Sequence, residues 1–272
     1  MKKCIVAMLV LVAAGLAFVA QSGFSDSQGQ ALGEARVVSA LGVGQVQGER
    51  AFVHVTVLVG AGQDEHAAVD AALQEQGARR ANRSDLESAE YRTSGLVWNQ
   101  FSDPDPNNNF VKQNYNPAND QTGGNGEGAL LASQATWTNA ASSFAFQYGG
   151  QTNRCPSLVK ECPGEQVFDG LHDVGWLDLG RCSARRCTLG VTWYSTSIDE
   201  ADMALTTRVS WSTGCTNVSG RYDAQTVLTH ENGHVVGLGH STVQQAVMYA
   251  YYGGARCPLH QDDIAGVSFL YP

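Results

Sequence analysis

The most constraining feature of the chain is an eleven-residue run, 230–240, with the sequence His-Glu-Asn-Gly-His-Val-Val-Gly-Leu-Gly-His. Residues four apart lie on the same face of an α-helix, so the imidazoles of His230 and His234 are predicted to converge on one ion. Gly237 is well placed to end that helix in a left-handed conformation, and the chain can then bring His240 back as a third ligand. The five fixed positions would coincide by chance in roughly two of every 10⁵ such chains, so the pattern strongly indicates a metal site.

Three histidines supply neutral nitrogen ligands, which suit Zn²⁺, and leave the fourth tetrahedral position open for water. Glu231 is offset from the two helical ligands and can therefore reach that water without binding the metal. The predicted chemistry is attack of a metal-activated water on a carbonyl group. One catalytic zinc ion lowers the pKa of its water to about 7, and Glu231 takes the proton as general base when the water attacks the carbonyl. A structural zinc would need a fourth protein ligand, and residues 230–240 offer none.

Four further histidines show no comparable ligand spacing: His54, His66, His172 and His260. We interpret them as ordinary polar residues. His54 stands in an alternating segment, 51–59, whose valines mark one face of a strand. We therefore expect His54 on the opposite, half-exposed face rather than at a metal.

The run from His230 to His240 resembles the extended zinc signature of the metzincins, HExxHxxGxxH. Downstream, Met248 matches the methionine of the metzincin turn, and the resemblance implies that it supports the site from beneath without binding the metal. The residue directly after the third histidine, Ser241, resembles the one found there in the matrixin branch. Residues 248–252, Met-Tyr-Ala-Tyr-Tyr, depart from the matrixin pattern Met-Tyr-Pro-x-Tyr only by alanine for proline. The chain is thus similar to a bacterial-type secreted matrixin.

The resemblance implies an α+β fold: a metzincin-type catalytic domain with a twisted mixed sheet, two main helices and a short C-terminal helix, over residues 91–272. It is specific over residues 221–272 and looser before them. Apolar spacing predicts one of the helices over 127–144. Substrate is expected to lie extended along the upper edge strand, near residues 189–194.

The first 22 residues have the pattern of a secretory signal peptide: Lys2 and Lys3 precede an apolar stretch, 4–20, and the sequence then turns polar. A transmembrane anchor is the alternative, but the stretch is short of the ~20 residues a span needs and has no basic flank after it. We therefore expect export, to the extracellular space or the periplasm.

Residues 23–90 are predicted to form an N-terminal region that is either a propeptide or a small accessory unit. Residues 23–48, rich in Gly, Gln and Ser, are interpreted as a linker, followed by a strand over 51–59 and a helix within 64–80. No cysteine lies between Cys4 and Cys155, so the cysteine-based latency of vertebrate matrixins cannot operate. If the region is a propeptide, we expect an Asp or Glu to block the zinc.

Loss of the signal peptide would leave six cysteines, and an even number in an exported chain implies disulfides, with 15 ways to pair. Proximity favours pairing them in chain order. The candidates are Cys155 with Cys162, Cys182 with Cys187, and Cys215 with Cys257. A zinc site built on cysteines is disfavoured, because no Cys-x2-Cys pair occurs.

A formal net charge of -9, without clusters of Lys and Arg, argues against a nucleic-acid partner and against a polybasic membrane contact after signal removal. We expect a monomer that acts on a peptide or protein. Asp103 and Asp105 offer oxygen ligands for Ca²⁺, although a solvated loop is the favoured interpretation.

The alternative function is a secreted zinc-containing binding or adhesion protein without turnover. Glu231 argues against it, because a structural site does not need that carboxylate.

Overall fold

The computed structural model describes residues 35–46, 49–82, 98, 110–156, 169–183, 185–195 and 200–272. All of them belong to one compact unit, 33–272, and residues 1–32 fall in a second unit. The predicted signal peptide, the loop with Asp103 and Asp105, and Cys162 therefore lie outside the described residues. No helix in the described part of the chain is long and apolar enough to cross a membrane.

The main element is a nine-stranded mixed sheet in the order β3-β1-β2-β8-β9-β6-β4-β5, with β7 paired to β8. Its strands are β1 (Arg36–Val46), β2 (Glu49–Val59), β3 (Ala78–Arg80), β4 (Val111–Tyr115), β5 (Phe146–Gln151), β6 (His172–Leu177), β7 (Cys182–Ser183), β8 (Arg186–Ser195) and β9 (Ala201–Thr206). A short parallel pair, β10 (Trp211–Ser212) and β11 (Tyr222–Asp223), stands apart. Strands β9, β6, β4 and β5 run parallel, and β8 is antiparallel to both of its neighbours, β9 and β2.

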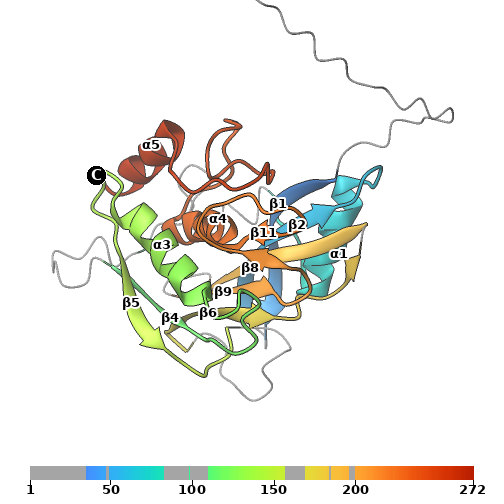
Figure 1. Ribbon diagram of the computed structural model, residues 1–272, viewed down its shortest axis with the longest axis horizontal. Coiled ribbons are helices and arrows are strands. Elements are labelled where there is room, and N and C mark those ends of the chain that lie inside the picture. Colours follow the sequence, from blue (N-terminus) through green and yellow to red (C-terminus); the bar gives the residue numbers. More distant parts are fainter. Residues whose placement is uncertain are drawn as a thin grey trace, which may run out of the picture. The chain divides into compact units, whose positions relative to one another are not determined.

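Helices cover both faces of this sheet: α1 (Glu65–Glu75), α3 (Gly126–Thr138), α4 (Ala224–Val236) and α5 (Gln261–Leu270). Figure 1 shows α3 and α4 close together, and their side chains share one core with Phe52 and Leu189 of the sheet. On the other face, α1 packs through Val69 and Leu73 on the valines of β2. The prediction of an α+β fold with a mixed sheet is confirmed.

The valines at alternate positions of residues 51–59 form the buried face of a strand, as predicted. The predicted helix over 127–144 is present as α3 but ends at Thr138, and Trp137 on it is buried. The linker prediction for residues 23–48 is wrong where the chain is described, because β1 spans Arg36–Val46. Its glycines suit this strand: a Cβ at Gly42 would clash with Leu73 of α1, so glycine lets the helix approach closely.

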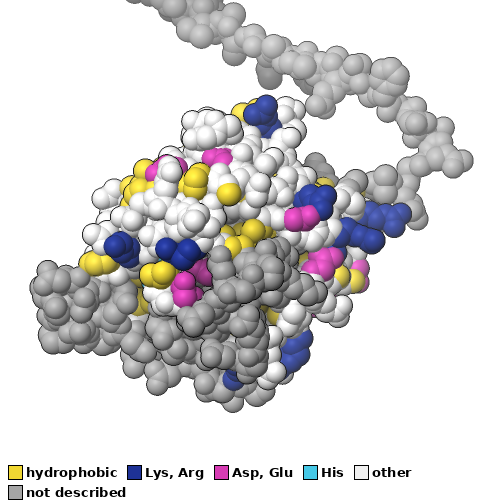
Figure 2. All heavy atoms as spheres, turned by 90° about the horizontal axis from the view of Figure 1, so that it is seen from below, with side chains coloured by type: hydrophobic (Ala, Val, Ile, Leu, Met, Phe, Trp, Pro, Cys, Tyr) yellow, Lys and Arg dark blue, Asp and Glu magenta, His cyan; other side chains and the backbone are white. Residues whose placement is uncertain are grey.

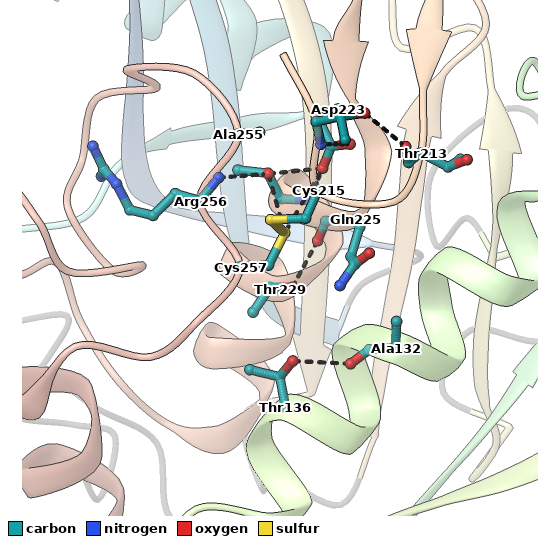
Figure 3. The surroundings of a disulfide bond; sticks show 12 residues. Ala132, Thr136, Thr213, Cys215, Asp223, Gln225, Thr229, Ala255, Arg256 and Cys257 are labelled. Carbon is teal, nitrogen blue, oxygen red and sulfur yellow. Dashed lines mark hydrogen bonds between the residues drawn. A yellow bond between two sulfur atoms is a disulfide. The ribbon is translucent and has the colours of Figure 1, made fainter. Parts of the chain in front are cut away.

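Two of the expected disulfides are present, Cys182–Cys187 and Cys215–Cys257. Cys155 is also disulfide-bonded. Figure 3 shows the Cys215–Cys257 disulfide beside Asp223 at the start of α4, with Arg256 next to it. This crosslink therefore ties the entry of α4 to the segment that leads into α5.

Asp223 is the N-cap of α4, and it is fully buried. Its Oδ1 accepts from the backbone N–H and the hydroxyl of Thr226, both at 2.7 Å, and its Oδ2 accepts from the N–H of Thr216 at 3.3 Å. Asp223→Ala is expected to lower the free energy of unfolding by about 2 kcal/mol, the upper end for a lost cap. Asp64→Ala removes the exposed cap of α1, a single bond to Ala67, and should cost less. Urea denaturation measures both, and equal losses would contradict this ranking.

Charge does not mark a binding site on the face shown in Figure 2, where the described acidic and basic side chains are scattered among uncharged groups. The chemically reactive groups are instead gathered in the interior, between α4 and the sheet.

Candidate active site

Helix α4 carries His230 and His234 one turn apart, and both rings point to the same place. Their Nε2 atoms are 3.1 Å apart. Gly237 ends the helix with φ 109°, a left-handed conformation that residues with a Cβ adopt only at a cost. The chain then returns His240, whose ring centroid lies 5.0 Å from that of His234 and 5.4 Å from that of His230. The helix, the glycine stop and the returning loop thus bring three imidazoles together.

Backbone carbonyls orient the two helical histidines. The Nδ1–H of His230 donates to the carbonyl of Val247 and that of His234 to the carbonyl of Leu238, each at 2.8 Å. With Nδ1 protonated, the lone pair of each ring is on Nε2, which faces the cluster. Burial lowers the pKa of His230 to about 4 and that of His240 to about 3. Burial also lowers the pKa of His234 well below its usual value, so all three rings are neutral donors near pH 7.

Zn²⁺ fits this donor set. Zinc–nitrogen bonds of about 2.0–2.1 Å in a tetrahedron place the nitrogens about 3.4 Å apart, close to the 3.1 Å between His230 and His234. The Nε2 of His240 is buried and, among the atoms that the structure describes, has no hydrogen-bond partner. A buried unpaired nitrogen is costly, and a metal ion at this point would satisfy it.

Glu231 lies beside the histidines on α4, fully buried. Its Oε2 accepts from the Thr192 hydroxyl of β8 at 2.6 Å and its Oε1 from the Thr56 hydroxyl of β2 at 2.5 Å. Burial raises the pKa of Glu231 to about 7, against the lowering effect of the two hydroxyls. A carboxylate with a pKa near neutrality can both take and return a proton.

Two small features hold α4 against its surroundings. Met248 is buried with its sulfur against Gly233, where any Cβ would clash with it. Gly190 of β8 leaves room for Glu231, since a Cβ there would lie 3.0 Å from Oε1. Met248 thus supports the middle of α4, and Gly190 lets the carboxylate approach the sheet.

The expectation that residues 189–194 form a free edge strand is wrong for this chain. They belong to β8, and β2 pairs with β8 along its length, from Phe52 opposite Tyr194 to Val59 opposite Arg186. Figure 1 shows β1 and β2, in blue, beside β8. We call β1 and β2 together the N-terminal hairpin.

The expectation for His54 is also wrong. His54 is buried, at 5% exposure, and its ring stacks on that of His234 with centroids 3.4 Å apart. The alternation in β2 identified the two faces correctly, but the face opposite the valines packs on α4 instead of facing water. The sequence did contain a sign that this face is buried. Phe52 and Leu58 lie on the same face as His54, and large apolar side chains of this kind rarely gather on a solvent-exposed face.

The other three histidines outside the motif are away from the cluster. His66 is exposed on α1. His172 is buried and its Nδ1 accepts from the N–H of Ala201 at 3.1 Å. His260 is the N-cap of α5, where its Nδ1 accepts from the N–H of Asp262. The side chains of His172 and His260 have structural partners and that of His66 is exposed, as is ordinary for polar residues.

The geometry defines a class: a three-histidine metal site with an adjacent buried glutamate, on a helix packed against a mixed sheet. The sequence model of the matrixin family, Peptidase_M10, matches residues 100–272, which is more than half of the chain. The chain therefore belongs to the matrixin family, and its fold is that of the metzincins.

Individual relatives align over shorter stretches. Metalloendoproteinase 2-MMP of Arabidopsis thaliana is 39% identical over 57 residues, which are 20% of this chain and 15% of that protein. Matrilysin of Rattus norvegicus is 52% identical over 48 residues, 16% of this chain and 18% of its own length. Karilysin of Tannerella forsythia is 47% identical over 49 residues, 18% of this chain and 10% of the relative. The matched stretch is thus less than a fifth of each of these relatives.

Proposed function

We propose that the protein is a secreted zinc-dependent endopeptidase. The observation that carries the proposal is the convergence of His230, His234 and His240 beside the buried carboxylate of Glu231. Membership of the matrixin family supports it. A merely structural metal site would not need an ionisable group with a pKa near 7 next to its ligands.

The three histidines would hold the zinc ion through nitrogen. When bound, zinc supplies Lewis-acid polarisation of the scissile carbonyl and acidifies a water molecule. Glu231 takes the proton of the attacking water as general base and returns it to the leaving amine. Thr192 keeps that carboxylate in place through its hydroxyl.

A cavity beside His230 is suited to a substrate side chain. Its lining includes Val227, Tyr249, Tyr252 and Arg256. We propose that these groups receive the side chain that follows the scissile bond, and that the substrate is an extended peptide or an unfolded protein. An apolar pocket with a few polar groups is typical of specificity sites.

We further propose the division of the chain that the sequence suggests: a signal peptide over 1–22, an N-terminal region over 23–90 that is either a propeptide or a small accessory unit, and a catalytic domain over 91–272. The disulfides support export, because such bonds persist in oxidising compartments. N-terminal sequencing of the exported protein tests the first boundary.

Metal removal tests the activity. The protein should cleave unfolded casein, lose that activity when zinc is removed with a chelator, and regain it when one equivalent of zinc is restored. Because β2 of the N-terminal hairpin pairs with β8 beside the site, the assay includes material trimmed within residues 83–97. Hydrolysis that survives zinc removal would refute the mechanism. Zinc binding without hydrolysis in any form would favour the alternative of a binding protein.

A further inference from the structure

The cavity beside His230 contains a cationic side chain, Arg256, among walls that are otherwise apolar, aromatic or neutral at pH 7. No carboxylate belongs to its lining in the described part of the chain. A few well-placed polar groups in an apolar cavity decide which ligand it accepts and in which orientation. A permanent charge in such a place therefore bears directly on the choice of substrate.

The chain places Arg256 in the cavity through a turn and an anchor on α4. Gly254 has φ 108°, the left-handed conformation that reverses the chain after Tyr252. The N–H of Arg256 then donates to the Thr226 hydroxyl at 2.9 Å. Thr226 lies on α4 one turn before His230, so this bond fixes Arg256 on the same face of the helix as the first histidine. Figure 3 shows the side chain of Arg256 extending away from the adjacent disulfide.

The guanidinium group of Arg256 is held in one orientation. Its Nη1 donates to the carbonyl of Ala246 at 2.9 Å, and its Cζ lies over the ring of Tyr249, 5.9 Å from the centroid. Gly253 leaves room for it, since a Cβ there would lie 3.1 Å from Nη2. Among the described residues, the carbonyl of Ala246 is the acceptor that the guanidinium engages, so most of its N–H donors are left for a ligand.

Arg256 has no ion-pair partner among the residues that the structure describes. Partial burial lowers its pKa, against the raising effect of the Asp263 carboxylate, and an arginine still stays positively charged at neutral pH. Asp263 is already occupied by main-chain donors. Its Oδ2 accepts from the N–H groups of Val247 and His260, each at 2.8 Å, and its Oδ1 from that of Met248 at 3.1 Å. The cation in the cavity therefore lacks a counter-ion in direct contact.

The charge of Arg256 is felt at the histidine cluster. Burial is the main cause of the low pKa of His230, and the positive charge of Arg256 lowers that pKa further. The guanidinium and the imidazole also line the same cavity. A group that reaches Arg256 can therefore belong to a peptide whose scissile bond lies at the histidines.

We propose that Arg256 makes the protein select substrates with an acidic side chain, glutamate or aspartate, directly after the scissile bond. This rests on the proposed function, whose substrate class it specifies. A partly buried cation without a counter-ion is costly, and an incoming carboxylate relieves that cost through charge-assisted hydrogen bonds. An apolar side chain would fit the walls of the cavity but would leave the guanidinium unpaired.

Matched peptides test the selection. Quenched fluorescent peptides that differ only in the residue after the scissile bond, Glu, Gln, Leu or Lys, are compared by kcat/KM. The Glu peptide is expected to exceed its Gln counterpart by about tenfold or more, the effect of a hydrogen bond between charged groups. Ser39 and Thr56 of the N-terminal hairpin also line the cavity, so the zinc-loaded exported protein is assayed intact and after a cut within residues 83–97.

Substitution of Arg256 should change the ratio between peptides. Arg256→Met should use the Glu and Gln peptides equally while its kcat/KM for the Leu peptide stays close to that of the wild type. Arg256→Glu should reverse the preference toward Lys. Arg256→Lys should retain part of the preference for Glu, because it keeps the charge but loses the planar fork of donors. A merely structural role of Arg256 would lower cleavage of all four peptides alike and would contradict the proposal.

Arg221→Met is the matched control. Arg221 also donates from Nη1 to a main-chain carbonyl, that of Trp211, at 3.3 Å, but it is exposed and does not line the cavity. Its replacement should leave the ratio between the Glu and Gln peptides unchanged. Loss of the preference in this variant would show that the guanidinium in the cavity is not its source.

Binding is measured separately from turnover. Calorimetry uses a peptide whose scissile amide is reduced to a methyleneamine, with Glu or Gln after it. If the Glu form binds about tenfold more tightly to the wild type and no better to Arg256→Met, but no peptide is cleaved, the peptidase proposal fails and the role of Arg256 stands. If peptides are cleaved in a zinc-dependent way but the Glu form is neither cleaved nor bound better than the Gln form, the peptidase stands and the role of Arg256 is overturned. A Glu form with no advantage in either measurement overturns that role whether or not cleavage occurs.

Discussion

Glu231→Gln is expected to lower kcat/KM for peptide cleavage by about 10²- to 10⁴-fold, the contribution of a positioned general base. Glutamine keeps the size of the side chain, and its carbonyl oxygen can still accept from Thr192 or Thr56. The metal ligands are untouched, so zinc content should stay at one per chain. The loss should therefore appear in the chemical step and not in metal binding.

The comparison is made on trimmed protein with a quenched fluorescent peptide, and zinc is measured by elemental analysis. Glu127→Gln is the control, because Glu127 on α3 interacts with Tyr148 and Gln151, away from the histidines. Retention of more than about a tenth of the wild-type kcat/KM in Glu231→Gln would remove Glu231 from the role of general base.

The second large effect concerns stability. Replacing Cys215 and Cys257 together by serine is expected to lower the free energy of unfolding by about 4 kcal/mol, because this disulfide closes a loop with a sequence separation of 42. The loop contains α4, all three histidines and Met248. Loss of the crosslink raises the conformational entropy of the unfolded chain. In the folded state it also removes a constraint on the segment that carries the site.

The disulfide Cys182–Cys187 provides the matched control, with a sequence separation of only 5. Its replacement by two serines should cost about 2 kcal/mol by the same loop-length dependence. Urea denaturation without reductant measures both variants. An equal or greater loss at Cys182–Cys187 would show that loop length does not govern the stabilisation.

The site could be foreseen from sequence because its positions are local. The spacing of His230, His234 and Gly237 fixes a helix, its shared face and its left-handed end within a dozen residues, and the structure has these features. Local geometry of this kind needs no knowledge of the rest of the fold.

His54 and Thr56 could not be assigned to the site in the same way. They reach it through pairing of β2 with β8, across more than 130 positions of sequence, and a strand pattern says nothing about which strand lies next to it. The alternation correctly separated the valine face from the His54 face. It could not show that α4 covers the second face, because that depends on the packing of a distant helix.

The glycine-rich composition around β1 was similarly ambiguous. Glycine is common in linkers, but Gly42 and Gly44 are needed here because α1 and β3 pass too close for a Cβ. Only the neighbouring elements distinguish a flexible segment from a tightly packed strand.

The shared apolar core under α1 has a consequence for any trimmed form of the protein. Val191 and Trp193 of β8, together with Ala204 of β9, are buried there against side chains of β2 and α1. A form without residues 36–80 would present these side chains to water, and a contiguous apolar surface of this kind favours association. Release of the hairpin would thus expose an association-prone apolar surface on the face of the sheet that α1 covers, and would open the site on the face that α4 covers.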